Sequence, residues 1–181
     1  MTLQPHSTLV VPTCDLCDTH KGDTTGAFRV LPPVYRSFGG RSAFQGPVRT
    51  VKCHEDNTSV KALLESDGHI DTPTGRVGQV LVVDAGASLR RALVGGNIAA
   101  AAARNGWAGV LVDGCVRDLA ELSAVDLGVL ALALIPLPTE RRATGVVDGP
   151  VLIQGVTVRP GDWLYADVDG VVIGDRRLQG T

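Results

Sequence analysis

The chain has 181 residues, a length that suits one domain with a substantial core. Hydrophobic residues make up 44% of it and charged residues 20%, which is typical of an ordered globular protein and excludes a disordered chain. The net charge of −2 gives no attraction to nucleic acid or to an anionic membrane, and no apolar run approaches the roughly 18 residues needed to cross a bilayer. Because Met1–Val11 lacks a secretory pattern, we expect cytoplasmic localisation and four free thiols.

The first part of the chain predicts short elements separated by turns. Residues 1–12 read as an N-terminal extension, and Thr13 is the expected N-cap of a first helix. The expected elements are a helix at Cys14–His20, an extended segment at Arg29–Phe38, a strand at Pro47–Cys53, a helix at Thr58–Glu65 capped by Asp56 or Asn57, and a loop at Ser66–Gly78.

The centre of the chain predicts a β-α-β unit. Val80–Val83 and Gly109–Val112 are apolar runs too short for a helix and rich in β-branched residues, as buried parallel strands are. Between them, Ile98–Asn105 is dense in alanine and predicts a helix. Ligands of such units gather beyond the carboxyl ends of the strands, so polar residues there are the first candidates for chemistry.

The last third is rich in predicted strands. The expected elements are a short helix at Leu119–Leu127, strands at Val129–Ile135, Val151–Ile153, Val156–Val158, Trp163–Asp167 and Val171–Ile173, a connection at Glu140–Gly149, and a loose C-terminal tail at 176–181. The whole predicts a layered α/β domain with a parallel central sheet and an antiparallel second sheet.

Arg117 and Asp118 are the leading candidates for a functional pair. They follow a strand and open a helix, at the rim of the expected cleft. A guanidinium suits a carboxylate ligand, and an aspartate can hold a hard divalent cation that keeps several waters. The alternative is structural, with Asp118 capping its own helix and Arg117 pairing with a neighbouring acid, and spacing alone favours neither.

Other polar residues near these strand ends carry weaker signals. Gly95-Gly96-Asn97 precedes the alanine helix, where free amides attract anions, but a plain turn explains two glycines equally well. One of Arg90 and Arg91 is expected to support the cleft and the other to form a salt bridge or subunit contact. Asp84 and Asp113 end their strands and are as readily turn-formers as site residues.

The cysteines and histidines give no strong metal motif. Cys14 and Cys17 form a single CxxC, for which packing on a buried helix face is favoured over zinc or redox chemistry. Cys115 adjoins the Arg-Asp pair, and packing is again favoured over a nucleophilic role. His69 beside Asp71 is expected to be a solvated loop histidine. GxSxG, Walker A, HExxH and a glycine-rich adenosylmethionine loop are all absent from the sequence.

The central block resembles one known family. VVDAGASLRRALVGGNIAAAAARNGWAGVLVDGCVRDLAEL is similar to the RraA (regulator of ribonuclease E activity A) family, which includes 4-hydroxy-4-methyl-2-oxoglutarate aldolases. Further matching stretches are TCDLCD, FGGRSAFQGPVRTVKCHEDN and GDWLYADVDGVVI, in the same order along the chain. The resemblance implies an RraA-like domain at 13–175, a swivelling β/β/α fold with layered sheet, sheet and helix, and a homotrimer with sites between subunits.

The resemblance also implies roles for particular residues. Backbone amides of Gly95, Gly96, Asn97 and Ile98 would bind the carboxylate of a 2-oxo acid. Arg117 would bind substrate, and Asp118 would hold Mg²⁺ or Mn²⁺. One position departs from the pattern: Gly96 stands where aldolase-type members commonly carry an aspartate, 21 positions before the arginine.

Two functions follow from the resemblance. The first is a metal-dependent lyase that cleaves 4-hydroxy-4-methyl-2-oxoglutarate-type substrates to pyruvate and decarboxylates oxaloacetate. The alternative is a non-catalytic regulator that inhibits ribonuclease E by binding a ribonuclease or helicase surface, without touching nucleic acid or a membrane.

Overall fold

A computed structural model describes residues 10–179, so most of the predicted extension at 1–12 lies outside the described residues. The helices are α1 (Thr13–His20), α2 (Thr58–Leu64), α3 (Gly96–Arg104) and α4 (Leu119–Ala124). The strands are β1 (Phe28–Val30), β2 (Arg36–Ser37), β3 (Phe44–Lys52), β4 (His69–Thr72), β5 (Gly75–Gly78), β6 (Val80–Asp84), β7 (Ala92–Val94), β8 (Gly109–Val116), β9 (Gly128–Leu134), β10 (Val146–Val147), β11 (Val151–Ile153), β12 (Val156–Val158), β13 (Trp163–Ala166) and β14 (Val171–Gly174).

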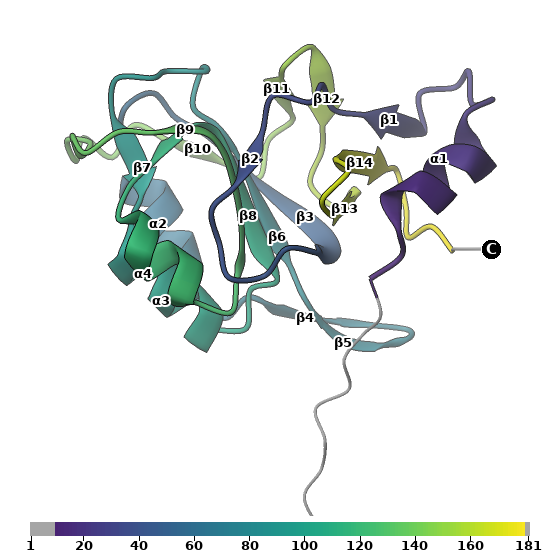
Figure 1. The fold of residues 1–181 in the computed structure, drawn as a ribbon, viewed down its shortest axis with the longest axis horizontal. Helices are drawn as coiled ribbons and strands as arrows, with labels where there is room; N and C mark the ends of the chain where they lie inside the picture. Colours follow the sequence, from purple (N-terminus) through teal and green to yellow (C-terminus); the bar gives the residue numbers. More distant parts are fainter. Residues whose placement is uncertain (1–9, 180–181) are drawn as a thin grey trace, which may run out of the picture.

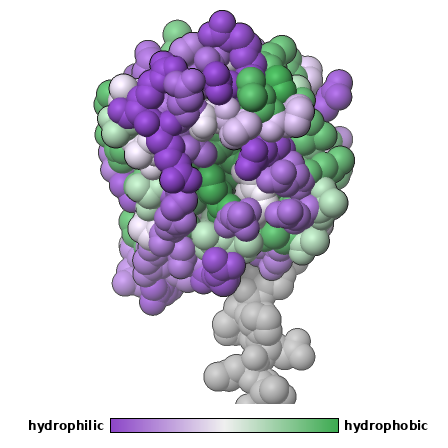
Figure 2. All heavy atoms as spheres, turned by 90° about the vertical axis from the view of Figure 1, so that its left-hand side faces the viewer, coloured by the Kyte–Doolittle hydropathy of each residue, from purple (hydrophilic) through white to green (hydrophobic). Residues whose placement is uncertain are grey.

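The centre of the molecule is a parallel sheet in the order β3-β6-β8-β9, as the predicted β-α-β unit requires. Both faces of this sheet are covered, which is why β6 is buried along its whole length. Leu81 and Val83 point into a core shared with α2, α3 and α4, and Val80 and Val82 point into a core on the opposite face. The three helices form one layer beside the sheet (Figure 1). Hydrophilic residues cover much of their outer face (Figure 2).

Strand β3 joins the two halves of the fold. Its first residues, Phe44–Pro47, pair antiparallel with β13, whereas Val48–Lys52 pair parallel with β6. Strands β13, β14 and β1 continue from it as an antiparallel sheet, with α1 outside them (Figure 1). The expected α/β class and its layered sheet, sheet and helix arrangement are therefore confirmed.

Several predicted boundaries were wrong. The stretch Ser66–Gly78 is not a plain loop but a β4–β5 hairpin, because its glycines and proline fall at the turn and strand ends. Strand β8 does not end at Val112 but runs on to Val116, since short β7 pairs with its last residues. Strand β10 lies within the predicted connection Glu140–Gly149 and pairs with β3.

The ends of the domain are held by side-chain contacts. Thr13 is not an N-cap but lies inside α1, where its hydroxyl donates to Asp167 Oδ1 at 2.7 Å. Leu178, within the segment expected to be a loose tail, is instead buried, and its amide donates to the Tyr165 hydroxyl oxygen at 2.6 Å. No helix in residues 10–179 is long and apolar enough to cross a membrane.

Helix α2 begins at a buried carboxylate. Asp56 Oδ1 accepts hydrogen bonds from the Thr58 amide and hydroxyl, and its Oδ2 accepts from the amide and hydroxyl of Thr144. Of the two predicted caps, Asp56 therefore supplies the bonds, and Asn57 makes no side-chain cap. The side-chain Nδ2 of Asn57 donates instead to the Leu93 carbonyl in β7.

Candidate functional site

A cavity of about 210 Å³ lies where β7 and β8 end and where α3 and α4 begin. It gathers residues from segments that are far apart in the sequence. They are Asn57, Lys61, Ala92, Leu93, Gly95, Asn97, Ile98, Arg117, Asp118, Pro138, Thr139 and Arg141. The predicted pair and most of the predicted substrate loop thus meet in one place.

Arg117 and Asp118 both line this cavity. Arg117 Nε lies 3.4 Å from Asp118 Oδ2, and each side chain is between a third and two fifths exposed. Asp118 is the N-terminal flanking residue of α4 but makes no side-chain cap. Its Oδ2 accepts a hydrogen bond from the Gly96 amide at 3.2 Å instead. The structural alternative therefore holds for Arg117, which pairs with an acid, and fails for Asp118, which does not cap its own helix.

The glycine pair allows the chain to approach this carboxylate. A Cβ on Gly95 would lie 2.5 Å from Asp118 Oδ2, so a side chain there would push the aspartate away. Beyond the pair, Asn97 and Ile98 occupy the first turn of α3, where amides have no carbonyl four residues back within the helix. Such amides suit an anionic group.

The same cavity is lined by two cations that the sequence pattern did not identify. Lys61 comes from α2 and pairs with Glu65 at 2.7 Å. Arg141 comes from the segment after β9 and makes no ion pair with any residue in 10–179. Thr139 Oγ1 is buried and makes no hydrogen bond to the described residues. No periodicity or motif marks these three positions, because folding alone places them beside Arg117.

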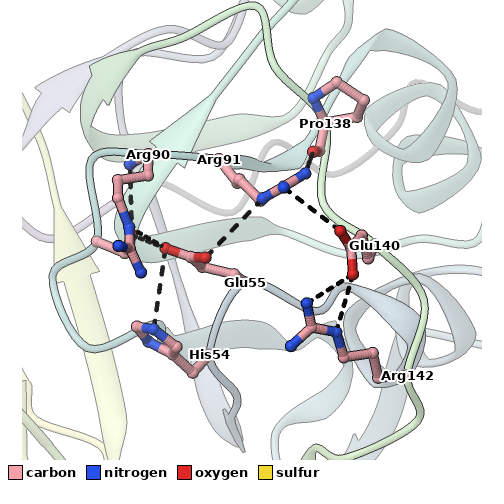
Figure 3. A network of polar contacts seen from close by, with 8 residues as sticks. His54, Glu55, Arg90, Arg91, Pro138, Glu140 and Arg142 are labelled. Atoms are coloured by element: carbon pink, nitrogen blue, oxygen red, sulfur yellow. Dashed lines mark hydrogen bonds and ion pairs between the residues drawn. The ribbon is translucent and has the colours of Figure 1, made fainter.

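An ionic network holds the segment that carries Thr139 and Arg141. Arg91 donates to the Pro138 carbonyl at 2.9 Å and pairs with Glu140, which also binds Arg142. Glu55 lies between Arg90 and Arg91 (Figure 3). The hydrogen bond from Ser88, followed by that from Arg90, lowers the pKa of Glu55, so this carboxylate stays ionised at neutral pH. Arg91 is thus the residue that supports the cavity, as one of the two arginines was expected to do.

The oxygen donors fit a hydrated divalent cation. Asp118 Oδ2 is occupied by the Gly96 amide and Arg117, whereas its Oδ1 makes no hydrogen bond or ion pair to the described residues. Across residues 10–179 no three His, Cys, Asp or Glu side chains are grouped to form a closed metal site. Mg²⁺ and Mn²⁺ suit an open arrangement, because they bind through one or two carboxylates and keep waters or substrate oxygens.

The remaining strand-end carboxylates have structural partners. Asp84 Oδ1 accepts from the Gly86 amide and shapes the turn after β6. Asp113 is buried and accepts from the Tyr35 hydroxyl at 3.0 Å and the Gln154 amide at 2.8 Å. Burial, followed by the charge of Asp113, raises the pKa of Tyr35 far above its usual range, so the phenol stays protonated. Neither carboxylate lines the cavity.

The cysteines show no sign of activation. Burial raises the pKa of the Cys115 thiol, which opposes thiolate formation. Asp169 raises the pKa of Cys14, and burial raises that of Cys17. The packing expected for this pair is only partly right, because Cys14 is exposed and Cys17 half-buried.

His69 does not pair with Asp71. Its Nδ1 lies 2.8 Å from Asp67 Oδ1, and it lines a separate hollow of about 690 Å³ beside Trp107 and Trp163. That hollow is larger than the cavity at Asp118. It contains neither the Arg117-Asp118 pair nor any residue of the Gly95–Ile98 loop, so we assign the candidate site to the smaller cavity.

The fold and this cavity define an α/β protein whose polar site lies at the carboxyl ends of a parallel sheet and is lined by one arginine-aspartate pair. A family model described as "RraA-like: Aldolase/RraA" matches residues 13–173. The chain belongs to this family.

Relatives of two kinds share its sequence. A protein of Albidiferax ferrireducens named "Putative 4-hydroxy-4-methyl-2-oxoglutarate aldolase" is 69% identical over 166 residues, which cover 92% of this chain and 96% of the relative. A Burkholderia mallei protein of the same name is 50% identical over a stretch that covers 94% of this chain and 99% of the relative. Among solved structures, the RNA-processing inhibitor RraA from Thermus thermophilis is 43% identical with a TM-score of 0.84, covering 96% of this chain and 98% of that one.

A second solved structure carries a different name. It is described as an S-adenosylmethionine: 2-dimethylmenaquinone methyltransferase from Geobacillus kaustophilus. It is 38% identical with a TM-score of 0.81, and the match covers 92% of this chain and 96% of that one. These names divide between an aldolase, an inhibitor and a methyltransferase, so the family alone does not decide the chemistry.

Proposed function

We propose that the protein is a divalent-metal-dependent lyase that cleaves 4-hydroxy-4-methyl-2-oxoglutarate-type substrates to pyruvate and decarboxylates oxaloacetate. The observation that carries this proposal is the convergence of Arg117, Asp118 and the Gly95–Ile98 loop on one cavity. The aldolase name of relatives up to 69% identical supports it.

The charges of the cavity favour a dicarboxylate. Lys61 and Arg141 form one set of groups that line it, and Arg117 with Asn97 and Ile98 of the first turn of α3 forms another. A substrate with a carboxylate at each end can use both sets, and a guanidinium binds a carboxylate through two parallel bonds. The buried Thr139 hydroxyl offers one more hydrogen bond to a substrate oxygen.

The reaction breaks the bond between C3 and C4 of the substrate. The 4-hydroxyl loses its proton and becomes a carbonyl, and the electron pair passes to C3 and the 2-oxo group, giving a pyruvate enolate that is then protonated. A divalent cation held by Asp118 would supply Lewis acidity toward the 2-oxo oxygen. Arg117 would bind the same end of the substrate and stabilise its developing negative charge. Loss of CO₂ from oxaloacetate leaves the same enolate.

Pyruvate release provides the test. With oxaloacetate or 4-hydroxy-4-methyl-2-oxoglutarate and added Mg²⁺ or Mn²⁺, the wild-type protein should release pyruvate, and Asp118→Asn should lower the rate by roughly a hundredfold or more. Asp71→Asn is a matched control, because Asp71 lies in the β4–β5 hairpin, away from the cavity. Equal rates in the wild type and Asp118→Asn would overturn the proposal.

A second candidate is a non-catalytic inhibitor of ribonuclease E that works by protein–protein contact. The observation that favours it is the 43% identity to an RNA-processing inhibitor with the same fold. It predicts no pyruvate release with any metal, together with slower cleavage of RNA by ribonuclease E when the protein is added. Because the two readouts are independent, the same preparation separates the two functions.

A further inference from the structure

The start of α3 is in contact with a carboxylate outside the predicted set. Gly96 is buried although it begins a helix at the surface. A Cβ built on Gly96 would lie 1.7 Å from Glu121 Oε2 and 2.6 Å from Glu121 Cβ. The Glu121 carboxylate therefore occupies the space into which any side chain at position 96 would project.

This contact brings Glu121 close to Asp118. The Gly96 amide donates to Asp118 Oδ2 at 3.2 Å, while Glu121 covers the α-carbon of the same glycine. The Glu121 amide also donates to the Asp118 carbonyl at 3.0 Å, because both residues belong to the first turn of α4. Two carboxylates thus flank one residue at the edge of the cavity.

Glu121 is a carboxylate without an ion-pair partner among the described residues. Arg117 is the cation paired with Asp118, and Glu121 forms no ion pair with any residue in 10–179. Although Lys61 and Arg141 also line the cavity, Glu121 adds an unpaired negative charge in the turn that begins with Asp118. Such a charge attracts a divalent cation, and groups outside the direct ligands tune metal affinity.

We infer that Glu121, held over Gly96, is a positioning residue that strengthens the binding of a divalent cation at Asp118. The inference rests on the proposed function and deepens it, because Glu121 can occupy its place only while position 96 is glycine. An acid at this place in the site is supplied by α4, and glycine at position 96 makes room for it. The plainer alternative is a surface glutamate that only favours the N-terminus of α4.

Mn²⁺ binding, followed by electron paramagnetic resonance of the free ion, tests the inference without measuring activity. Glu121→Gln keeps the size of the side chain and should weaken Mn²⁺ binding by roughly tenfold, as loss of supporting groups typically does. Gly96→Ala should displace Glu121 and weaken binding by a similar factor. In a Glu121→Ala background, Gly96→Ala should have little further effect. Asp71→Asn is the charge-matched control and should bind as the wild type does.

A double variant tests whether a loss of Mn²⁺ affinity comes from misfolding rather than from the missing carboxylate. Gly96→Asp combined with Glu121→Ala places a carboxylate at the same spot from α3, and it should restore most of the affinity that Glu121→Ala loses. Wild-type Mn²⁺ affinity in Glu121→Gln, with binding abolished in Asp118→Asn, would overturn this inference alone. Absence of Mn²⁺ binding by the wild type would overturn both this inference and the proposed metal-dependent function.

Discussion

At the scale of single residues, Asp118 has an unusual backbone. Its φ of 65° and ψ of 51° lie in the left-handed region, which costs most L-residues about 1 kcal/mol and is tolerated best by glycine, asparagine and aspartate. This conformation turns the chain from β8 into α4 and directs the carboxylate toward Gly96 and the cavity. Backbone strain at such a position is often associated with function.

Replacing Asp118 by glycine and by alanine separates this strain from the side chain. Both variants lose the hydrogen bond to the Gly96 amide, but only alanine keeps the strained Cβ. We expect Asp118→Gly to be more stable than Asp118→Ala by about 1 kcal/mol in urea unfolding. The same pair at Asp71, in strand β4, should show the opposite order, because glycine weakens strands. Equal stabilities at position 118 would contradict the expectation.

At the scale of elements, the cavity depends on connections that hold helix starts and loops in place. Asp56 joins the start of α2 to Thr144. Arg91 joins the turn before β7 to the segment after β9 (Figure 3). Neither residue carries the proposed chemistry, yet both fix where Lys61, Thr139 and Arg141 lie relative to Arg117.

Asp56 should make stability depend on acid pH. Burial raises its pKa, but hydrogen bonds from the Thr144 amide and from Thr58 outweigh this and hold it well below the ordinary value of 3.8. A depressed pKa contributes stability that is present above about pH 4 and is lost as the pH falls below that. Asp56→Asn should therefore cost about 1–3 kcal/mol at pH 7 and show a flatter loss of stability from pH 5 to pH 2.5. Thermal melts across this range would detect it, and parallel curves would refute it.

Arg91 should affect substrate binding more than metal binding. Without it, the Pro138 carbonyl and Glu140 lose their contact with the turn before β7, so Thr139 and Arg141 are held less firmly. We expect Arg91→Gln to raise the KM for oxaloacetate roughly tenfold while leaving Mn²⁺ affinity unchanged. Arg90→Gln is the matched control, because Arg90 also binds Glu55 but does not contact the 138–142 segment. Equal KM values in the two variants would rule out this role.

At the scale of the whole molecule, two loops and the start of α4 carry exposed apolar side chains. Leu89, Leu119 and Leu137 are each about half exposed, with fractions of 56%, 47% and 50%. Apolar surface of this kind is common where copies of a chain meet. It supports the trimer that family resemblance implies, which stays a prediction, as does cytoplasmic localisation.

Multi-angle light scattering tests the trimer directly. We expect a mass about three times the 18.9 kDa of one chain. Leu137→Asp should shift the mass toward the monomer and lower pyruvate release with it, if sites lie between subunits. Leu152→Asp, at an exposed leucine on strand β11, serves as the control and should leave the mass unchanged. A wild-type monomer would exclude sites between subunits.

The sequence by itself determined the elements whose signal is local. The apolar runs of β6 and β9 and the alanine run of α3 favour burial whatever their neighbours in the fold. Their secondary structure, strand or helix, could therefore be predicted from composition and periodicity. The same holds for Arg117 and Asp118, because the residues that follow a buried strand in a β-α-β unit lie at its carboxyl end. The Ser66–Gly78 hairpin was missed because its glycines and proline predict turns without showing which residues pair across them.

Only the tertiary structure decided what surrounds that pair. Lys61 lies far in the chain from Thr139 and Arg141, and these residues reach one cavity through sheet order and the contacts of Arg91. The contact of Glu121 with Gly96 depends on how α3 and α4 pack, and no pattern in either segment encodes it. Local sequence sets the backbone preference and the burial of a few neighbouring residues. A site depends on the distances between segments that are remote in the chain, and only the packing of the whole molecule sets those distances.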